Sequence, residues 1–158
     1  MHARRKADPL IAAVHATATI ATGWYLLGPL PSVLFFLGFV VGFALWLLSP
    51  KLPHFAAIRW PYFLTLALFC VHKVEERQAG FFPALSKLTG VPIPQSIGPM
   101  GALLYMLAAA WLLAPWLIKR RHPLGGYLAW SFFASMGITE LAHFVFPLFM
   151  GPRYGYFP

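Results

Sequence analysis

Long apolar runs, separated by short polar or proline-rich segments, dominate the hydrophobic pattern of this chain. A helix needs about 20 predominantly apolar residues to cross a bilayer, and five of the runs approach or exceed that length. They cover residues 9–27, 32–48, 58–76, 100–118 and 124–149. We therefore predict one all-α domain over residues 1–158, a polytopic transmembrane helical bundle with about five spans.

The segment 80–99 interrupts this pattern, because four prolines and three glycines make it too broken to span a membrane. Two interpretations fit it equally well. It is either a plain outer loop or a short surface helix over residues 83–88, with Phe81, Phe82 and Leu88 in contact with lipid. In the second case it directly follows residues 72–76 and can cover them.

The composition supports a membrane protein and excludes an ordinary soluble domain. Hydrophobic residues make up 59% of the chain and charged residues 10%, against about 25% charged residues in soluble domains. The net charge of +8 would suggest nucleic acid as the partner of a soluble protein. Here the basic residues lie in short segments between apolar runs, where they anchor a protein to anionic lipid. We therefore expect a lipid bilayer and no nucleic acid as partner.

Lysine and arginine are unevenly distributed over the connecting segments, which predicts the orientation. With the N-terminus inside, eight of these residues lie on the inner side and four on the outer side. The inner residues are Arg4, Arg5, Lys6, Lys51, Arg59, Lys119, Arg120 and Arg121, and the outer ones are Lys73, Arg77, Lys87 and Arg153. We predict a multi-pass protein of the cell membrane with its N-terminus inside.

Gly38 and Gly42 lie four residues apart in the second run. Small residues at this spacing allow two membrane helices to approach closely. Ordinary glycines without such a contact are the alternative.

Ionisable side chains in the third and fifth runs are the candidates for function, because charged groups are costly inside a membrane. Three of the four acidic residues lie in or at the edge of these runs. His72, Glu75 and Glu76 share one helix face at spacings of three and four residues. Glu140 and His143 share a face of the fifth run.

The sequence His72-Lys73-Val74-Glu75-Glu76 at the end of an apolar run resembles the H-x-x-E-E motif of the HXXEE family of small bacterial integral membrane proteins. The continuation through residues 77–83, with its glycine, phenylalanines and proline, is also similar to that family. The resemblance covers most of the chain and implies a multi-pass protein of the bacterial inner membrane. It points to the histidine and the two glutamates of the motif but implies no particular reaction.

The ionisable residues of the third run and those of the fifth run must also lie at similar depths if they form one site. Counted from Pro61, His72 lies about 16 Å along its helix, and Glu140 lies about 25 Å along its helix from Pro123. These groups converge if the helix starts differ from these residues by a few positions. His15 in the first run lies about 12 Å along its helix, nearer the inner half of the membrane, and is left as a candidate partner of the ligands.

Metal binding is the leading interpretation of this group. His72, Glu75, Glu76, Glu140 and His143 provide enough ligands for a mononuclear or dinuclear site of divalent Fe, Mn or Zn. The spacing Glu140-x-x-His143 matches the unit used by di-iron carboxylate bundles, whereas His72-x-x-Glu75 has the reverse order. We expect such a site to act on a lipid or isoprenoid-like hydrophobic substrate.

Two further interpretations remain open. In the first, Glu75 and Glu140 are the catalytic groups of a metal-free acid–base isomerase or cyclase, since a buried carboxyl group can donate a proton. In the second, the charges form structural ion pairs in a non-catalytic membrane subunit. Lys73 would then pair with Glu76, which would leave Glu75 as the stronger ligand or acid.

Overall fold

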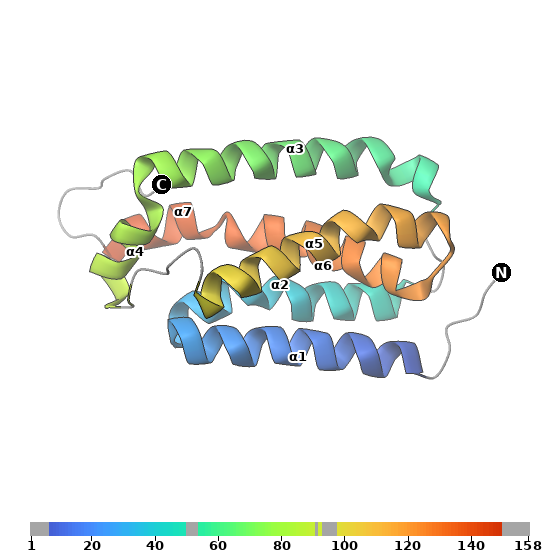
Figure 1. The fold of residues 1–158 in the computed structure, drawn as a ribbon, viewed down its shortest axis with the longest axis horizontal. Coiled ribbons are helices and arrows are strands. Elements are labelled where there is room, and N and C mark those ends of the chain that lie inside the picture. Colours follow the sequence, from blue (N-terminus) through green and yellow to red (C-terminus); the bar gives the residue numbers. More distant parts are fainter. Residues whose placement is uncertain (1–6, 50–53, 91, 93–97, 150–158) are drawn as a thin grey trace.

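The computed structural model describes residues 7–49, 54–90, 92 and 98–149. Every regular element in these ranges is helical, which confirms the predicted all-α fold. Figure 1 shows the long helices lying side by side along one axis. The elements are α1 (Ala7–Leu27), α2 (Pro29–Leu48), α3 (Phe55–Ala79), α4 (Phe81–Thr89), α5 (Pro99–Lys119), α6 (Pro123–Thr139), α7 (Ala142–Val145) and the 3-10 helix η1 (Phe146–Phe149).

Within the described residues, five helical segments are long and apolar enough to cross a membrane, so the chain is a multi-pass membrane protein. Four of these segments are α1, α2, α3 and α5, and the fifth runs from Pro123 to Val145 through α6 and α7. The inward position of the N-terminus stays a prediction. Five of the basic residues on which it rests lie outside the described residues, namely Arg4, Arg5, Lys6, Lys51 and Arg153.

Small residues allow α2 and α6 to pack closely at the centre of the bundle. A Cβ atom on Gly38 would overlap the backbone of Ser135, and one on Gly42 would overlap the backbone of Ser131. The two serines are themselves four residues apart, so both helices present small residues at the same spacing. This confirms the interpretation of the two glycines as a close helix contact.

Trp111 of α5 lies at the centre of an aromatic core. Its ring stacks on Phe39 of α2 at a centroid distance of 5.6 Å and lies 5.1 Å from the ring of Phe132 in α6. Its indole N–H donates to Ser131 Oγ over 3.3 Å. These contacts join α2, α5 and α6 into one body.

Tyr62 fastens α3 to this core. Its side chain is fully buried, and its hydroxyl donates a hydrogen bond of 2.7 Å to the backbone carbonyl of Trp111. Pro115, four residues after Trp111, has no N–H, so that carbonyl lacks its usual helical donor. Figure 1 shows α3 along the edge of the bundle. Apart from Tyr62, Glu76 is the only buried residue of this helix.

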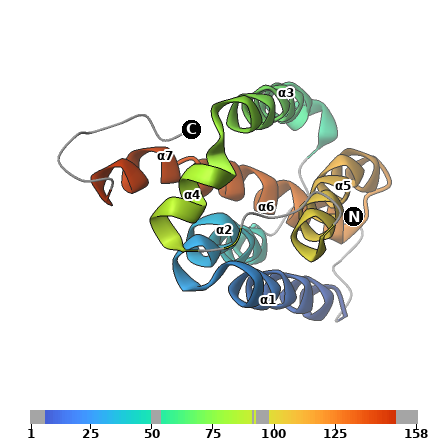
Figure 2. The ribbon, with the colours of Figure 1, turned by 60° about the vertical axis from the view of Figure 1, so that its left-hand side comes forward.

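The segment after α3 contains a short helix, although part of 80–99 lies outside the described residues. Gly80 separates α3 from α4 in a left-handed conformation, with φ of 77°, which glycine adopts without strain. Figure 2 shows α4 turned back beside α2 at one end of the bundle. Phe81, which the surface-helix interpretation placed in lipid, is buried instead, because it packs with Leu85 against α2 and lies 5.9 Å from the ring of Phe35.

The last apolar run, expected over 124–149, is divided into separate elements. α6 ends at Thr139, the residues Glu140 and Leu141 form a turn, and α7 begins at Ala142. The backbone N–H of His143 bonds to the carbonyl of Glu140 across this turn over 3.2 Å. A candidate site residue therefore lies at the division of the run, and a second one lies in the short helix that follows.

Candidate metal centre

Helices α3 and α6 carry the candidate site to the same level of the bundle. His72 comes 17 residues after Phe55, the start of α3 (72 minus 55), and Glu140 comes 17 residues after Pro123, the start of α6 (140 minus 123). Both helices run in the same direction, so each residue lies about 25 Å from the start of its helix. Counting from Pro61 had underestimated the depth of His72 by about 9 Å.

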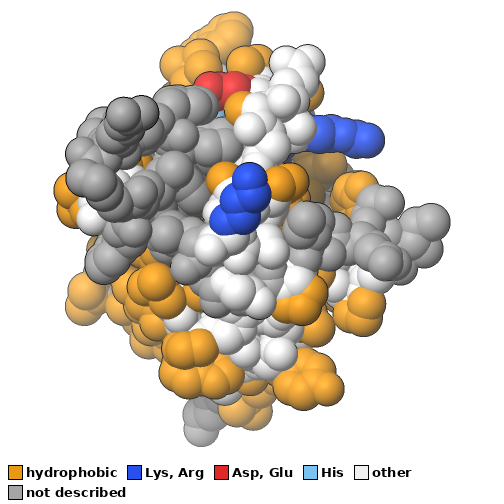
Figure 3. Space-filling view, turned by 90° about the vertical axis from the view of Figure 1, so that its left-hand side faces the viewer, with side chains coloured by type: hydrophobic (Ala, Val, Ile, Leu, Met, Phe, Trp, Pro, Cys, Tyr) orange, Lys and Arg blue, Asp and Glu red, His pale blue; other side chains and the backbone are white. Residues whose placement is uncertain are grey.

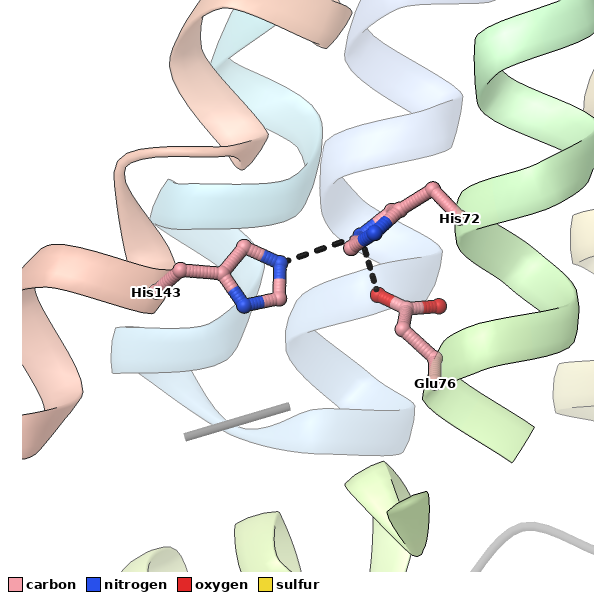
Figure 4. Close-up of side chains that lie close together, drawn as sticks. All are labelled: His72, Glu76 and His143. Atoms are coloured by element: carbon pink, nitrogen blue, oxygen red, sulfur yellow. Dashed lines mark hydrogen bonds and ion pairs between the residues drawn. The ribbon is translucent and has the colours of Figure 1, made fainter. Parts of the chain in front are cut away.

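Four ligand atoms meet between α3, the end of α6 and α7. His72 Nε2 lies 3.0 Å from His143 Nε2, 3.2 Å from Glu76 Oε1 and 3.3 Å from Glu140 Oε2. His143 Nε2 lies 3.4 Å from the same Glu140 oxygen. Figure 4 shows the rings of His72 and His143 and the Glu76 carboxylate pointing toward one another. We call His72, Glu76, Glu140 and His143 the metal-site cluster.

Hydrogen bonds alone satisfy this arrangement poorly. The Nε2 atom of an imidazole carries at most one hydrogen, so His72 can donate to only one of its three close neighbours. Two carboxylates also direct oxygen atoms at the same nitrogen, and like charges in so small a space repel each other. A cation between the four side chains would remove both difficulties, because all four atoms can donate electron pairs to it.

The spacing of the cluster also matches a coordination sphere. Two atoms that each lie about 2.1 Å from one ion are about 3.0 Å apart at a right angle and about 3.4 Å apart at the tetrahedral angle. Four of the six separations between these atoms, 3.0, 3.2, 3.3 and 3.4 Å, fall within these limits. His72, Glu76 and His143 each offer an atom within 4.8 Å of the others, a group that does not include Glu140.

The Glu76 carboxylate is shared between the cluster and Lys73. Its Oε2 atom accepts from the Lys73 ammonium group, while its Oε1 atom faces His72. We expected that such a pair would leave Glu75 as the stronger ligand. The structure retains Glu76 in the cluster, because the two oxygens of one carboxylate can serve two partners.

Glu75 has a different position from the other predicted ligands. Its Oε2 atom lies 3.5 Å from His72 Nδ1, the ring nitrogen that points away from the cluster, and its side chain is 53% exposed. A carboxylate behind a metal-binding histidine is a common arrangement, since it fixes the ring orientation and raises the basicity of the other nitrogen. The structure therefore places Glu75 beside the cluster and not among its four converging atoms.

His15, our candidate partner of the ligands, lies outside the metal-site cluster. Its Nδ1 atom is 2.8 Å from the Tyr127 hydroxyl, and its ring packs against Phe39. By contrast, Phe81 lies close to the site, 6.5 Å between its ring and that of His143. The surface-helix interpretation placed this ring in lipid, whereas the position of the segment directly after residues 72–76 had indicated that it can cover the site.

No protein-family model matches the chain, and neither does any curated protein or solved structure. The resemblance of residues 72–76 to the HXXEE family therefore stays a prediction. What the chain does must be argued from the metal-site cluster and its position in the membrane.

Proposed function

We propose that this chain is a membrane metalloprotein whose metal-site cluster holds one divalent Fe, Mn or Zn ion and acts on a lipid or isoprenoid-like substrate. The observation that carries the proposal is the convergence of ligand atoms of His72, Glu76 and His143 within 4.8 Å of one another, with a Glu140 oxygen 3.3 and 3.4 Å from the two histidine nitrogens. We also propose that the chain belongs to the HXXEE family and lies in a bacterial cell membrane with its N-terminus inside.

The chemistry of the ligands favours these ions. Two imidazole nitrogens and two carboxylate oxygens suit Fe, Mn and Zn, whereas Mg and Ca prefer oxygen ligands alone. Two carboxylates balance the charge of a divalent ion, which lowers the cost of placing the ion in a membrane protein. With four protein ligands, an octahedral Fe or Mn ion would keep about two positions for substrate or water, whereas a tetrahedral Zn ion would keep none unless one carboxylate is released.

The two predicted catalytic residues would have different roles. Glu140 is the more accessible carboxylate of the metal-site cluster, with 39% of its side chain exposed against 7% for Glu76. It is therefore the ligand best placed to meet a substrate and to exchange a proton with it. Glu75, behind His72, would hold the imidazole in position and increase its affinity for the ion.

Metal content tests this proposal directly. The untagged protein is purified in detergent, incubated with Fe²⁺, Mn²⁺ or Zn²⁺, desalted and measured by elemental mass spectrometry. We expect about one ion per wild-type chain and a loss of most of it in His72→Ala, His143→Ala and Glu140→Ala, because each substitution removes one of four ligands.

His15→Ala is the matched control, because it removes a partly buried histidine that contacts Tyr127 outside the metal-site cluster. It should retain the ion. Circular dichroism and gel filtration establish that every variant is folded, with His72→Gln as a second variant at the central ligand. Folded wild-type protein that binds none of the three ions would refute the metal proposal. Metal-free acid–base catalysis would then be the function to test.

A further inference from the structure

The metal-site cluster is closed on the side of α4. Phe81 is buried at the start of α4, and its ring lies 6.5 Å from that of His143. The Lys73 ammonium group, which binds Glu76, lies 5.9 Å from the centre of the same ring. Figure 2 shows α4 between the end of α3 and α2. The start of α4, with its buried aromatic ring, therefore covers this side of the cluster.

The side of α6 is open at Gly137, one helical turn before Glu140. Gly137 is exposed, and apart from its chain neighbours and the backbone of its own helix, no described atom lies within 4 Å of the position that its Cβ atom would occupy. It differs from Gly38 and Gly42, where a Cβ atom would overlap α6. Glycine inside a helix is less stable than alanine, and helix packing does not compensate for that cost here.

Apolar side chains surround the exposed part of the site. The residues next to the ligands in the sequence are exposed and hydrophobic, namely Val71 before His72 and Leu141 after Glu140. Phe144, one residue after His143, is exposed as well. Figure 3, which views this end of the bundle, shows acidic side chains at the surface next to hydrophobic ones. Exposed apolar groups on a membrane-spanning helix face hydrocarbon, so the open side faces the bilayer.

We infer that the substrate enters from the bilayer beside Gly137, on the exposed side of α6. A linear hydrocarbon chain, as in an isoprenoid alcohol, lies against Gly137 while its polar end reaches Glu140. Gly137 is then the specificity-determining residue, because a larger side chain would occupy the space that the hydrocarbon needs. This inference rests on the proposed function for the reacting group, whereas the path of entry depends only on shape and polarity.

Photochemical labelling tests the path without any requirement for metal. The full chain is placed in lipid nanodiscs with a photoreactive diazirine analogue of farnesol, irradiated, digested and mapped by mass spectrometry. We expect the label to concentrate on Glu140 and the residues that follow it, because activated diazirines react readily with carboxylates. Gly137→Leu should reduce this labelling at least about fivefold, and Gly137→Ala should reduce it less.

Ala109→Leu is the matched control, since it adds the same side chain to an exposed position of α5. It should leave the labelling of Glu140 within about twofold of wild type. Equal labelling in Gly137→Leu, or a label spread evenly over all exposed helices, would overturn the inference. Labelling as expected in a protein that binds no metal would support the entry path and refute only the metal proposal.

Discussion

Replacement of Tyr62 by phenylalanine removes a single hydroxyl group at the point where α3 is fastened to α5. That hydroxyl donates over 2.7 Å to the Trp111 carbonyl, inside the aromatic core. Pro115 lacks the N–H that would otherwise bond to this carbonyl. The variant therefore leaves a buried acceptor without its side-chain donor while the ring remains in place.

The expected cost follows from the environment of this hydrogen bond. An unsatisfied buried polar group costs about 1–3 kcal/mol, whereas side-chain hydrogen bonds between membrane helices average about 0.6 kcal/mol and reach about 1.7. The carbonyl of Trp111 has no helical donor to return to, so we expect the upper part of the membrane range. We predict that Tyr62→Phe lowers the free energy of unfolding by about 1–1.7 kcal/mol.

A double-mutant cycle with Pro115→Ala isolates the cause. Alanine restores a backbone N–H four residues after Trp111, so the loss of the Tyr62 hydroxyl should matter less in that background. Reversible unfolding in mixed detergent micelles, followed by circular dichroism, gives the four free energies. Tyr105→Phe, which removes a hydroxyl from an exposed tyrosine of α5, is the control and should change stability by less than about 0.5 kcal/mol.

An equal loss of unfolding free energy from Tyr62→Phe in the wild-type and Pro115→Ala backgrounds would refute this prediction. Such a result would mean that the hydroxyl of Tyr62 does not replace the backbone donor that Pro115 removes from the Trp111 carbonyl. A cost equal to that of the Tyr105 control would be equally decisive, because it would show that the bond adds nothing to stability.

Three further predictions concern the helix contact and the metal-site cluster. Gly42→Ala should destabilise the fold by about 1–3 kcal/mol in the same unfolding assay, because its Cβ atom would overlap the Ser131 backbone. Gly137→Ala, in open space, should not, and equal effects would contradict the close packing of α2 and α6. Glu75→Ala should weaken metal binding about 10–100-fold in a chelator competition titration without changing the stoichiometry. Unchanged affinity would exclude a positioning role behind His72. Acidification from about pH 7 to about pH 5 should release the ion, because protons compete for the histidine and glutamate ligands. Full retention of the ion at the lower pH would argue against these ligands.

The hydrophobic pattern was sufficient for the fold, because each membrane-crossing helix needs its own apolar run. The glycine spacing in α2 also predicted a close contact, although only the structure identified Ser131 and Ser135 as the opposite surface. The turn at Glu140 was not predictable from that pattern, since the run continues with apolar residues and contains no glycine or proline at the turn. Nor did Pro115 reveal that a tyrosine from α3 would bind the carbonyl it leaves free.

The sequence named all four members of the metal-site cluster, but it did not separate Glu75 from Glu76. Both lie close to His72 on the surface of an ideal helix, at three and four residues from it. Which of the two faces the bundle depends on the rotation of α3 about its own axis. That rotation is set by contacts between helices, and the spacing of residues within one helix does not predict those contacts.

Tyr62 explains how this rotation is fixed. At 100° per residue, Glu76 follows Tyr62 by 14 residues and lies about 40° from it around the helix, whereas Glu75 lies about 140° away. Once the Tyr62 hydroxyl is bonded to α5, Glu76 must therefore face the bundle and Glu75 must turn outward, as their burial shows. The carbonyl left free by Pro115 thus selects the ligand at the opposite end of α3, about 21 Å along the helix axis.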